Sequence, residues 1–153
     1  MSNRSDNEYV ILVVDDDADD RLLIQEAATE CNLRATIQFV DDGMELMDYL
    51  YRRGRFSGED ADSPLLVLLD LNMPRKDGRE ALREMKTTPS LCHIPVVVLT
   101  TSRAVRDVHQ CYALGASAYI PKPSSFEGLV ELVRTLGTHW IDLALLPPRS
   151  IGG

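Results

Sequence analysis

Several short apolar segments of this chain end in polar side chains, and this arrangement limits the folds that it can adopt. The clearest is residues 65–69, a run of five apolar residues followed directly by Asp70. A run this short and dense is typical of a parallel strand that is buried on both faces. In open sheets of such strands, sites form beyond the carboxyl ends of the strands. Asp70 is therefore the first candidate functional residue.

Three more apolar segments also end in side chains that can take part in chemistry. Residues 9–14 precede Asp15 and Asp16, residues 94–99 precede Thr100, and residues 118–120 precede Pro121 and Lys122. Because parallel strands place their carboxyl ends at one edge of a sheet, we expect acids, a hydroxyl and an ammonium group to meet there. Such a set suits a small, metal-assisted phosphoryl-transfer site.

Segments with helical composition separate the strand-like segments, and together they predict an α/β domain. Strands and helices alternate five times, which predicts a parallel sheet covered by helices on both faces. Residues 36–40 alternate polar and apolar side chains, so we expect this strand at the edge of the sheet. Several residues have the types expected at helix ends: Asp42, Asp77, Ser102, Ser124 and Ser125 at starts, and Gly115 at an end.

Two segments do not belong to this alternation. Residues 54–63 are polar and contain glycine, and we expect a long surface loop there. The last predicted helix continues past the sheet into residues 140–146, which are mainly apolar. This tail either folds back on the domain or covers a partner, and large exposed apolar patches are uncommon on monomers.

Composition and charge exclude several classes of function. A chain of 153 residues suits one domain with a full hydrophobic core. The formal net charge of -8 and the lack of a Lys/Arg cluster argue against nucleic acid as a partner. We expect no membrane span and no signal peptide, because the longest apolar runs have strand length and the N-terminus is polar. The three cysteines are odd in number and lack metal-ligand spacing, which suits buried or half-buried thiols in a reducing compartment, the cytoplasm.

The acids at the ends of the first and third strands require a counter-charge. Two carboxylates about 5 Å apart repel by roughly 3 kcal/mol at an effective dielectric constant of about 20. Asp15, Asp16 and Asp70 together would raise one another's pKa or bind a cation. Mg²⁺ fits this ligand set, because it prefers oxygen ligands and keeps several waters. Lys122 and Thr100 would then contact the oxygens of an incoming phosphoryl group.

These motifs resemble the receiver domain of two-component response regulators over residues 9–136. The resemblance rests on segments that fall at four strand ends in family order: Val14-Asp15-Asp16, Asp70-Leu71-Asn72-Met73-Pro74, Thr100 and Lys122-Pro123. It implies a doubly wound, flavodoxin-like sheet of five parallel strands in the order 2-1-3-4-5. It also implies a signalling protein that takes a phosphoryl group from a sensor histidine kinase and turns over no small-molecule substrate.

The same resemblance implies how the acidic residues share the work. Asp70 is the phosphate acceptor. Asp16, Asp70 and the backbone carbonyl of Asn72 bind Mg²⁺, and Asp15 assists through a water molecule. The ion and the acceptor are thus expected at the ends of the first and third strands.

The resemblance also assigns residues of the last two strands. Lys122 contacts the phosphoryl group, and Thr100 and Tyr119 form the switch pair. The bond between Lys122 and Pro123 is expected to be cis, as is usual in the family. Thr101 stands where many receivers have a smaller residue, and we expect its β-branched side chain to crowd the phosphoryl pocket.

Other features resemble the small regulators that are paired with bacterial and cyanobacterial phytochromes. These features are the long polar loop before the third strand, residues 94–102 and the tail that carries Trp140. They imply a phytochrome-type kinase as partner and a homodimer formed through the last helices and the tail. The expected organisation is a flexible N-terminus (1–8), a receiver domain (9–136) and a C-terminal extension (137–153). No effector domain is expected after the receiver domain.

Two alternatives stay open at this point. A small phosphohydrolase of the haloacid-dehalogenase type would use Asp15 as nucleophile, because residues 15–17 contain the Asp-x-Asp signature of that family. Against it, the later acidic pair of that family is absent and Asp70 would have no role. A receiver-like scaffold that is never phosphorylated is the other alternative. Asp17, Asp19 and Asp20 are expected to cap a helix or to lie on the surface.

Overall fold

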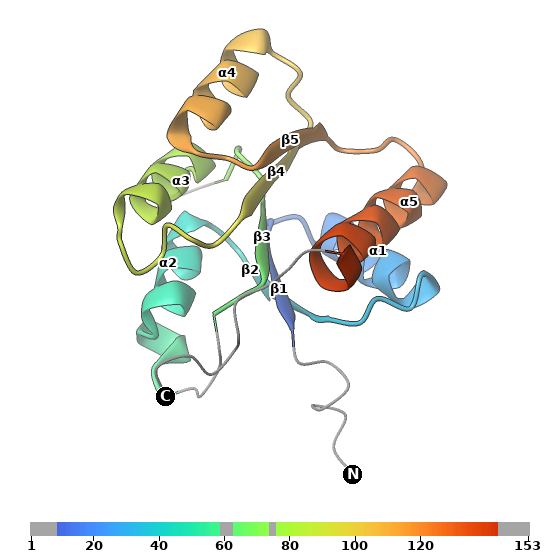
Figure 1. Ribbon diagram of the computed structural model, residues 1–153, viewed down its shortest axis with the longest axis horizontal. Coiled ribbons are helices and arrows are strands. Elements are labelled where there is room, and N and C mark those ends of the chain that lie inside the picture. Colours follow the sequence, from blue (N-terminus) through green and yellow to red (C-terminus); the bar gives the residue numbers. More distant parts are fainter. Residues whose placement is uncertain (1–8, 59–62, 74–75, 144–153) are drawn as a thin grey trace.

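The structure is built around a parallel sheet of five strands in the order β2-β1-β3-β4-β5 (Figure 1). This computed structural model describes residues 9–58, 63–73 and 76–143. The strands are β1 (Val10–Val14), β2 (Thr36–Val40), β3 (Leu66–Leu69), β4 (Val96–Thr100) and β5 (Ala118–Pro121). The helices are α1 (Ala18–Glu30), α2 (Gly43–Tyr51), α3 (Gly78–Thr87), α4 (Val105–Leu114) and α5 (Phe126–Gly137). The expected α/β class and strand order are confirmed, with β2 at an edge.

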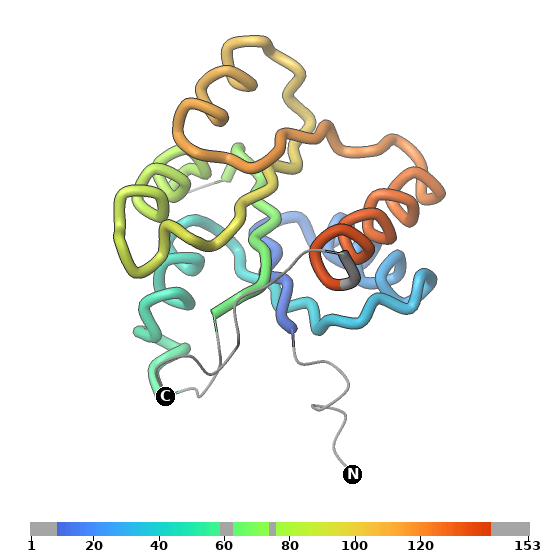
Figure 2. Tube along the Cα trace, viewed as in Figure 1, coloured from blue at the N-terminus to red at the C-terminus, as the bar shows by residue number. Residues whose placement is uncertain are grey.

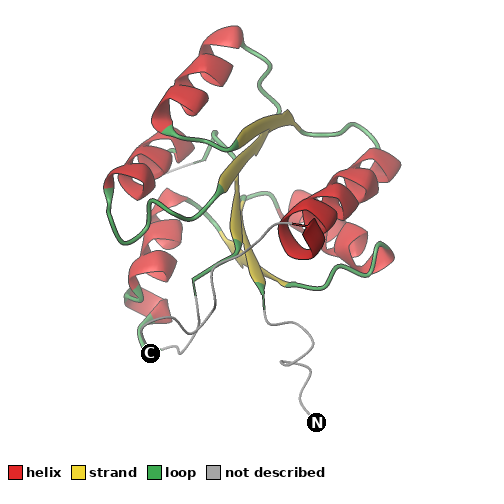
Figure 3. Ribbon diagram, viewed as in Figure 1, coloured by secondary structure: helices red, strands yellow, loops and turns green. Residues whose placement is uncertain are grey.

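Helices cover both faces of the sheet (Figure 3). On one face α1 packs against α5, and on the other α3 packs between α2 and α4. Alternate residues of β1 serve the two faces. Leu12 and Val14 pack in the core with α2, α3 and α4, whereas Ile11 and Val13 pack in the core with α1 and α5. A central strand therefore needs apolar residues at every position, which explains its unbroken apolar run.

The pairing of the strands brings their carboxyl ends together. The amide of Asp70 donates a hydrogen bond of 3.1 Å to the carbonyl oxygen of Val14. The amide of Lys122 donates a hydrogen bond of 2.8 Å to the carbonyl oxygen of Thr100. Consequently Asp15, Asp70, Thr100 and Lys122 all leave the sheet at the same edge.

Most predicted helix ends are confirmed. Asp42 and Ser125 are N-caps whose side chains accept backbone amides of α2 and α5. Asp77 forms a capping box with Glu80 at the start of α3. Gly115 ends α4 with a φ of 109°, a left-handed conformation that glycine adopts without steric cost.

The predicted helix cap at Ser102 is wrong. The helix α4 begins at Val105, and its N-cap position is Ala104, which has no side chain that could cap it. Ser102 lies two residues earlier, where its hydroxyl accepts the Ala104 amide at 3.3 Å and donates to Asp107 at 2.6 Å. The hydroxyl therefore ties the β4–α4 loop to the first turn of the helix.

The segment 54–63, predicted to be a surface loop, contains an apolar anchor. Its first residues form a short 3-10 helix, η1 (Gly54–Phe56). Phe56 is buried, and its ring meets the ring of Tyr49 edge-on at a centroid distance of 5.1 Å. The polar neighbours of Phe56 obscured this contact in the sequence. Residues 59–62 lie outside the described residues.

The chain continues beyond α5 into a π-helical turn, η2 (Thr138–Leu143). Figure 2 shows α5 lying beside α1 as the chain enters this turn. Trp140 and Ile141 are half-buried against the core formed with α1 and α5, so the tail begins by folding back on its own domain. The apolar residues 144–146 and the N-terminus 1–8, expected to be flexible, lie outside the described residues. Among the helices that the structure describes, none has the length and apolar character to cross a membrane.

Candidate functional site

Asp70 follows β3 directly, and donors from three directions hold its carboxylate. The Thr100 hydroxyl donates to Oδ1 at 3.2 Å, and the Asn72 amide donates to the same oxygen at 3.3 Å. The Lys122 ammonium donates to Oδ2 at 3.1 Å. The Asp70 side chain is 12% exposed, so it is fixed in place and still reachable from solvent.

Lys122 is shared among three carboxylates. Its Nζ lies 3.0 Å from Asp15 Oδ2, 2.7 Å from Asp20 Oδ2 and 3.1 Å from Asp70 Oδ2. Burial by itself would lower the pKa of Lys122. Hydrogen bonds to Asp20 and Asp15, together with the charges of Asp70 and Asp15, more than offset this effect and raise that pKa above its usual value. The lysine is therefore a permanent cation at this edge of the sheet.

Asp15 is the most buried acid of the site, with only 2% of its surface exposed. Burial raises the pKa of its carboxyl group, while the Asp17 amide and the Lys122 ammonium act in the opposite direction. The Asp17 amide donates to Oδ1 at 2.9 Å, and Lys122 donates to Oδ2. Asp15 is thus less accessible to an incoming group than Asp70, which disfavours Asp15 as a nucleophile.

Asp16 and Asn72 are exposed at the same edge of the sheet. The Asp16 carboxylate makes no hydrogen bond or ion pair within residues 9–58, 63–73 and 76–143. No cluster of three or more His, Cys, Asp or Glu side chains suited to a metal occurs in this part of the chain. The expected ligand set uses only two carboxylates, those of Asp16 and Asp70, and takes its third oxygen from the backbone of Asn72. An oxygen-only set that includes the exposed Asp16 carboxylate fits a hard divalent cation.

Thr100 and Tyr119, the predicted switch pair, lie on neighbouring strands. Thr100 is fully buried, and its hydroxyl donates to Asp70. Tyr119 is half-buried, and its hydroxyl donates to the carbonyl oxygen of Ser102 at 3.0 Å. Tyr119 therefore contacts the β4–α4 loop, which begins directly after Thr100.

Thr101, expected to crowd the pocket, has an exposed side chain.

Gly78 packs closely against the backbone of Asp70, which the sequence did not indicate beyond the place of Gly78 at a helix start. A Cβ atom at this position would lie 2.5 Å from the carbonyl oxygen of Asp70 and 2.9 Å from Cα of Leu71. The Gly78 amide also donates to the Leu71 carbonyl at 3.1 Å. Only a glycine allows α3 to begin so close to Asp70.

Two expectations about this site need correction. Asp20, expected to be a surface or cap residue, contacts Lys122, because the first turn of α1 lies over the end of β1. Of its neighbours, Asp17 is the N-cap of α1 as expected, and Asp19 is exposed. The bond between Lys122 and Pro123 is trans, as are the other peptide bonds of the described residues. The trans form is the more stable isomer of most bonds before proline.

The strand order and the placement of these residues define a class of protein. The family described as "Response regulator receiver domain" matches residues 11–134. The chain belongs to this family, and it is a signalling protein of the response-regulator class.

Relatives with the same fold show which response regulators this chain is similar to in sequence and structure. The response regulator Rcp1 of Synechocystis sp. is 38% identical over 147 residues, which cover 96% of this chain and 99% of Rcp1. The crystal structure of the Mn²⁺-bound form of Rcp1 matches with a TM-score of 0.81 and 37% identity, over 92% of this chain and 99% of that one.

Two further structures connect these relatives to light signalling. The phosphorylated cyanobacterial phytochrome response regulator RcpA has a TM-score of 0.83 and 40% identity, over 92% of this chain and 99% of that one. Response regulator RPA3017, from red light signalling of R. palustris, has a TM-score of 0.85 and 37% identity over the same shares. The chain is therefore similar to response regulators of phytochrome and red-light pathways.

Proposed function

We propose that Asp70 is the phosphate acceptor of this receiver and that Lys122 and Thr100 stabilise the transferred group. One observation carries this proposal: the Lys122 ammonium and the Thr100 hydroxyl donate to different oxygens of Asp70. A phosphoryl group on Asp70 would bring its own oxygens within reach of both donors. Positioning and charge stabilisation of this kind are what phosphoryl transfer mainly requires.

Mg²⁺ is the cation that we propose for the acidic pocket. Asp16, Asp70 and the backbone carbonyl of Asn72 would hold it, with Asp15 acting through a water molecule. The Mn²⁺-bound form of Rcp1 supports a divalent ion in this family. When bound, the ion supplies positive charge to the oxygens of the phosphoryl group.

The proposed reaction moves a phosphoryl group from a kinase histidine to Asp70. An oxygen of Asp70 attacks phosphorus, a P–O bond forms, and the P–N bond breaks with its electron pair left on the histidine nitrogen. Lys122 and Thr100 then donate to phosphoryl oxygens instead of to Asp70. We also propose that the protein promotes its own dephosphorylation, in which water attacks phosphorus, the P–O bond to Asp70 breaks and inorganic phosphate leaves.

Phosphorylation would act on the surface through Thr100 and Tyr119. As the Thr100 hydroxyl moves toward the phosphoryl group, Tyr119 would enter the space that it leaves. Tyr119 already contacts Ser102, whose hydroxyl is bound to Asp107 in the first turn of α4. A small shift at Thr100 would therefore change the face formed by α4 and β5.

Two protein partners are proposed. The first is a sensor histidine kinase of the phytochrome type, because RcpA is a phytochrome response regulator. The second is another copy of this chain, bound through the last helices and the extension 137–153 that follows the receiver domain 9–136. The exposed apolar residues Val105 and Tyr112 on α4 offer additional surface for association.

A cytoplasmic location suits the three free cysteines.

The acceptor is tested by incubating the protein with acetyl phosphate and Mg²⁺ and locating the phosphoryl group by mass spectrometry of peptides. We expect one phosphoryl group on Asp70 in the wild type and none on Asp70→Asn. The exposed Asp19→Asn variant should behave as the wild type does. A phosphoryl group on Asp15 would contradict the proposal and favour the phosphohydrolase alternative. A wild type that takes up no phosphoryl group from any donor would favour the scaffold alternative.

A further inference from the structure

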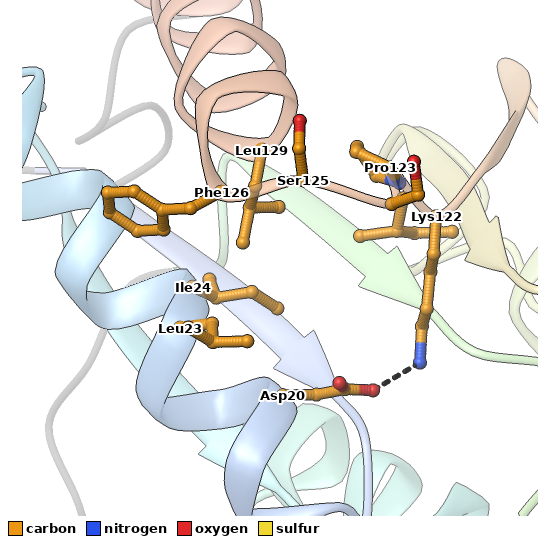
Figure 4. Close-up of a pocket in the computed structure, with 10 residues that line it drawn as sticks. Asp20, Leu23, Ile24, Lys122, Pro123, Ser125, Phe126 and Leu129 are labelled. Carbon is orange, nitrogen blue, oxygen red and sulfur yellow. Dashed lines mark hydrogen bonds and ion pairs between the residues drawn. The ribbon is translucent and has the colours of Figure 1, made fainter.

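Asp20 makes the shortest of the three contacts to the Lys122 ammonium, at 2.7 Å. Asp20 belongs to the first turn of α1, where its backbone amide donates to the Asp17 cap at 3.1 Å. In Figure 4 its carboxylate faces Lys122 at one end of a groove between α1 and α5, with Leu23 and Phe126 farther along. The contact therefore joins the start of α1 to the segment that follows β5.

Lys122 donates hydrogen bonds to three acids, and Asp20 differs from the other two in its role. An ammonium group has three N–H donors, and here each donor has one carboxylate acceptor. Two of the acceptors, Asp15 and Asp70, belong to the proposed metal and phosphoryl site. Asp20 is the partner of Lys122 that has no part in that site.

This difference matters when a divalent cation enters the pocket. The cation draws on the charges of Asp15 and Asp70, and like charges repel, so it weakens their hold on the ammonium group. The Asp20 carboxylate is outside the proposed metal ligand set, so its attraction for the Lys122 ammonium is not reduced in this way. The groove beside Asp20 is lined mainly by apolar side chains, where burying an unpaired ammonium group is unfavourable.

We propose that Asp20 is a positioning residue that keeps the Lys122 ammonium beside Asp70 when the pocket holds its metal ion. This inference rests on the proposed roles of Asp70 and Lys122. In the phosphorylated protein, Lys122 would donate to a phosphoryl oxygen while its bond to Asp20 stays in place. Asp20 would thereby set the direction from which Lys122 approaches the phosphoryl group.

The test measures the affinity for beryllofluoride, an anion that mimics the phosphoryl group, by fluorine NMR at saturating Mg²⁺. Loss of a charge alone would strengthen the binding of an anion, whereas loss of positioning would weaken it. We expect Asp20→Asn to bind about fivefold more weakly than the wild type, as suits a partly exposed ion pair. Asp19→Asn, which removes an exposed acid from the same turn, should match the wild type, and Asp20→Glu should recover most of the affinity.

A second readout follows the ammonium group itself. In the Mg²⁺–beryllofluoride complex, the ¹⁵N-coupled signal of the Lys122 ammonium should persist through slowed hydrogen exchange in the wild type and Asp19→Asn, and should disappear in Asp20→Asn. Unchanged or tighter binding by Asp20→Asn, with the signal retained, would overturn the inference while leaving the acceptor proposal intact. A wild type that binds no beryllofluoride would overturn both.

Discussion

At the scale of single residues, three consecutive acids have three different environments. Asp15 is buried and bound to Lys122, Asp16 is exposed, and Asp17 caps α1. Neighbouring residues of an extended chain point to opposite sides, so equal side chains meet unequal surroundings. The role of each carboxylate in this protein therefore depends on which donors reach it.

Gly78→Ala should lower both stability and phosphorylation. Alanine normally favours a helix over glycine, but here its Cβ would lie 2.5 Å from the Asp70 carbonyl oxygen. We expect a loss of about 1–3 kcal/mol in the free energy of unfolding, measured by urea denaturation, and slower labelling by acetyl phosphate.

Gly137→Ala is the matched control for that variant. Its Cβ would meet only the end of the flexible Leu33 side chain, at 2.8 Å. This change should be close to neutral in the same denaturation experiment. Equal stability of the two variants would contradict the role given to Gly78.

At the scale of elements, an ion pair joins α3 to α4 near Tyr119, a member of the proposed switch pair. Arg79 donates to Asp107 at 2.8 Å, and Ser102 donates to the other carboxylate oxygen at 2.6 Å. The bond from Ser102 and then that from Arg79 lower the pKa of Asp107 below its usual value. Because Tyr119 contacts the Ser102 carbonyl, these two helices and the proposed switch pair share one set of contacts.

Asp107→Asn should lower the free energy of unfolding by about 1 kcal/mol at neutral pH. Since the folded pKa lies below the unfolded value of 3.8, the contribution of Asp107 is present above that pH and is lost as the pH falls through the folded pKa. Urea denaturation across this range should show the gap between wild type and variant closing in acid.

The control for Asp107 is Glu131→Gln on α5. Glu131 pairs with Arg134 one turn away, and its side chain is 71% exposed. An exposed pair of this kind contributes little, so this variant should stay near the wild type at every pH. A gap for Asp107→Asn that grows in acid would contradict the stated direction of the pKa shift.

At the scale of the whole molecule, the sheet has a separate apolar core on each face. The core shared with α1 and α5 extends to Trp140 and Ile141, beyond the end of the last regular helix. The start of the C-terminal extension is thus part of the domain itself. Any dimer contact must be made by surface that remains after this packing.

Trp140→Ala should lower the free energy of unfolding by about 2 kcal/mol, less than for a fully buried tryptophan. Because Trp140 packs within its own chain, the loss should be the same at low and high protein concentration. The exposed Thr138→Ala provides the control. A loss that appears only at high concentration would instead place Trp140 at a dimer contact.

Much of the fold and part of the site could be predicted from local patterns. Asp70 follows a dense apolar run, Thr100 ends another strand and Lys122 follows a third, so the edge on which they meet follows from parallel pairing alone. The structure places Lys122 and Thr100 in hydrogen-bond contact with Asp70. Predictions were weaker where a residue's partner is distant in sequence, as with Asp20, Phe56 and Ser102.

The sequence by itself determined the alternation of strands and helices, the strand ends that carry the candidate site residues and most helix caps, because these depend on neighbouring residues and on periodicity. Only the tertiary structure decided that Asp20 reaches Lys122, that Gly78 must lack a side chain and that Trp140 packs on its own domain. These contacts join segments far apart in the chain, and their existence depends on how helices lie on the sheet. Local pattern carries no information about that placement, since packing over the whole core sets it.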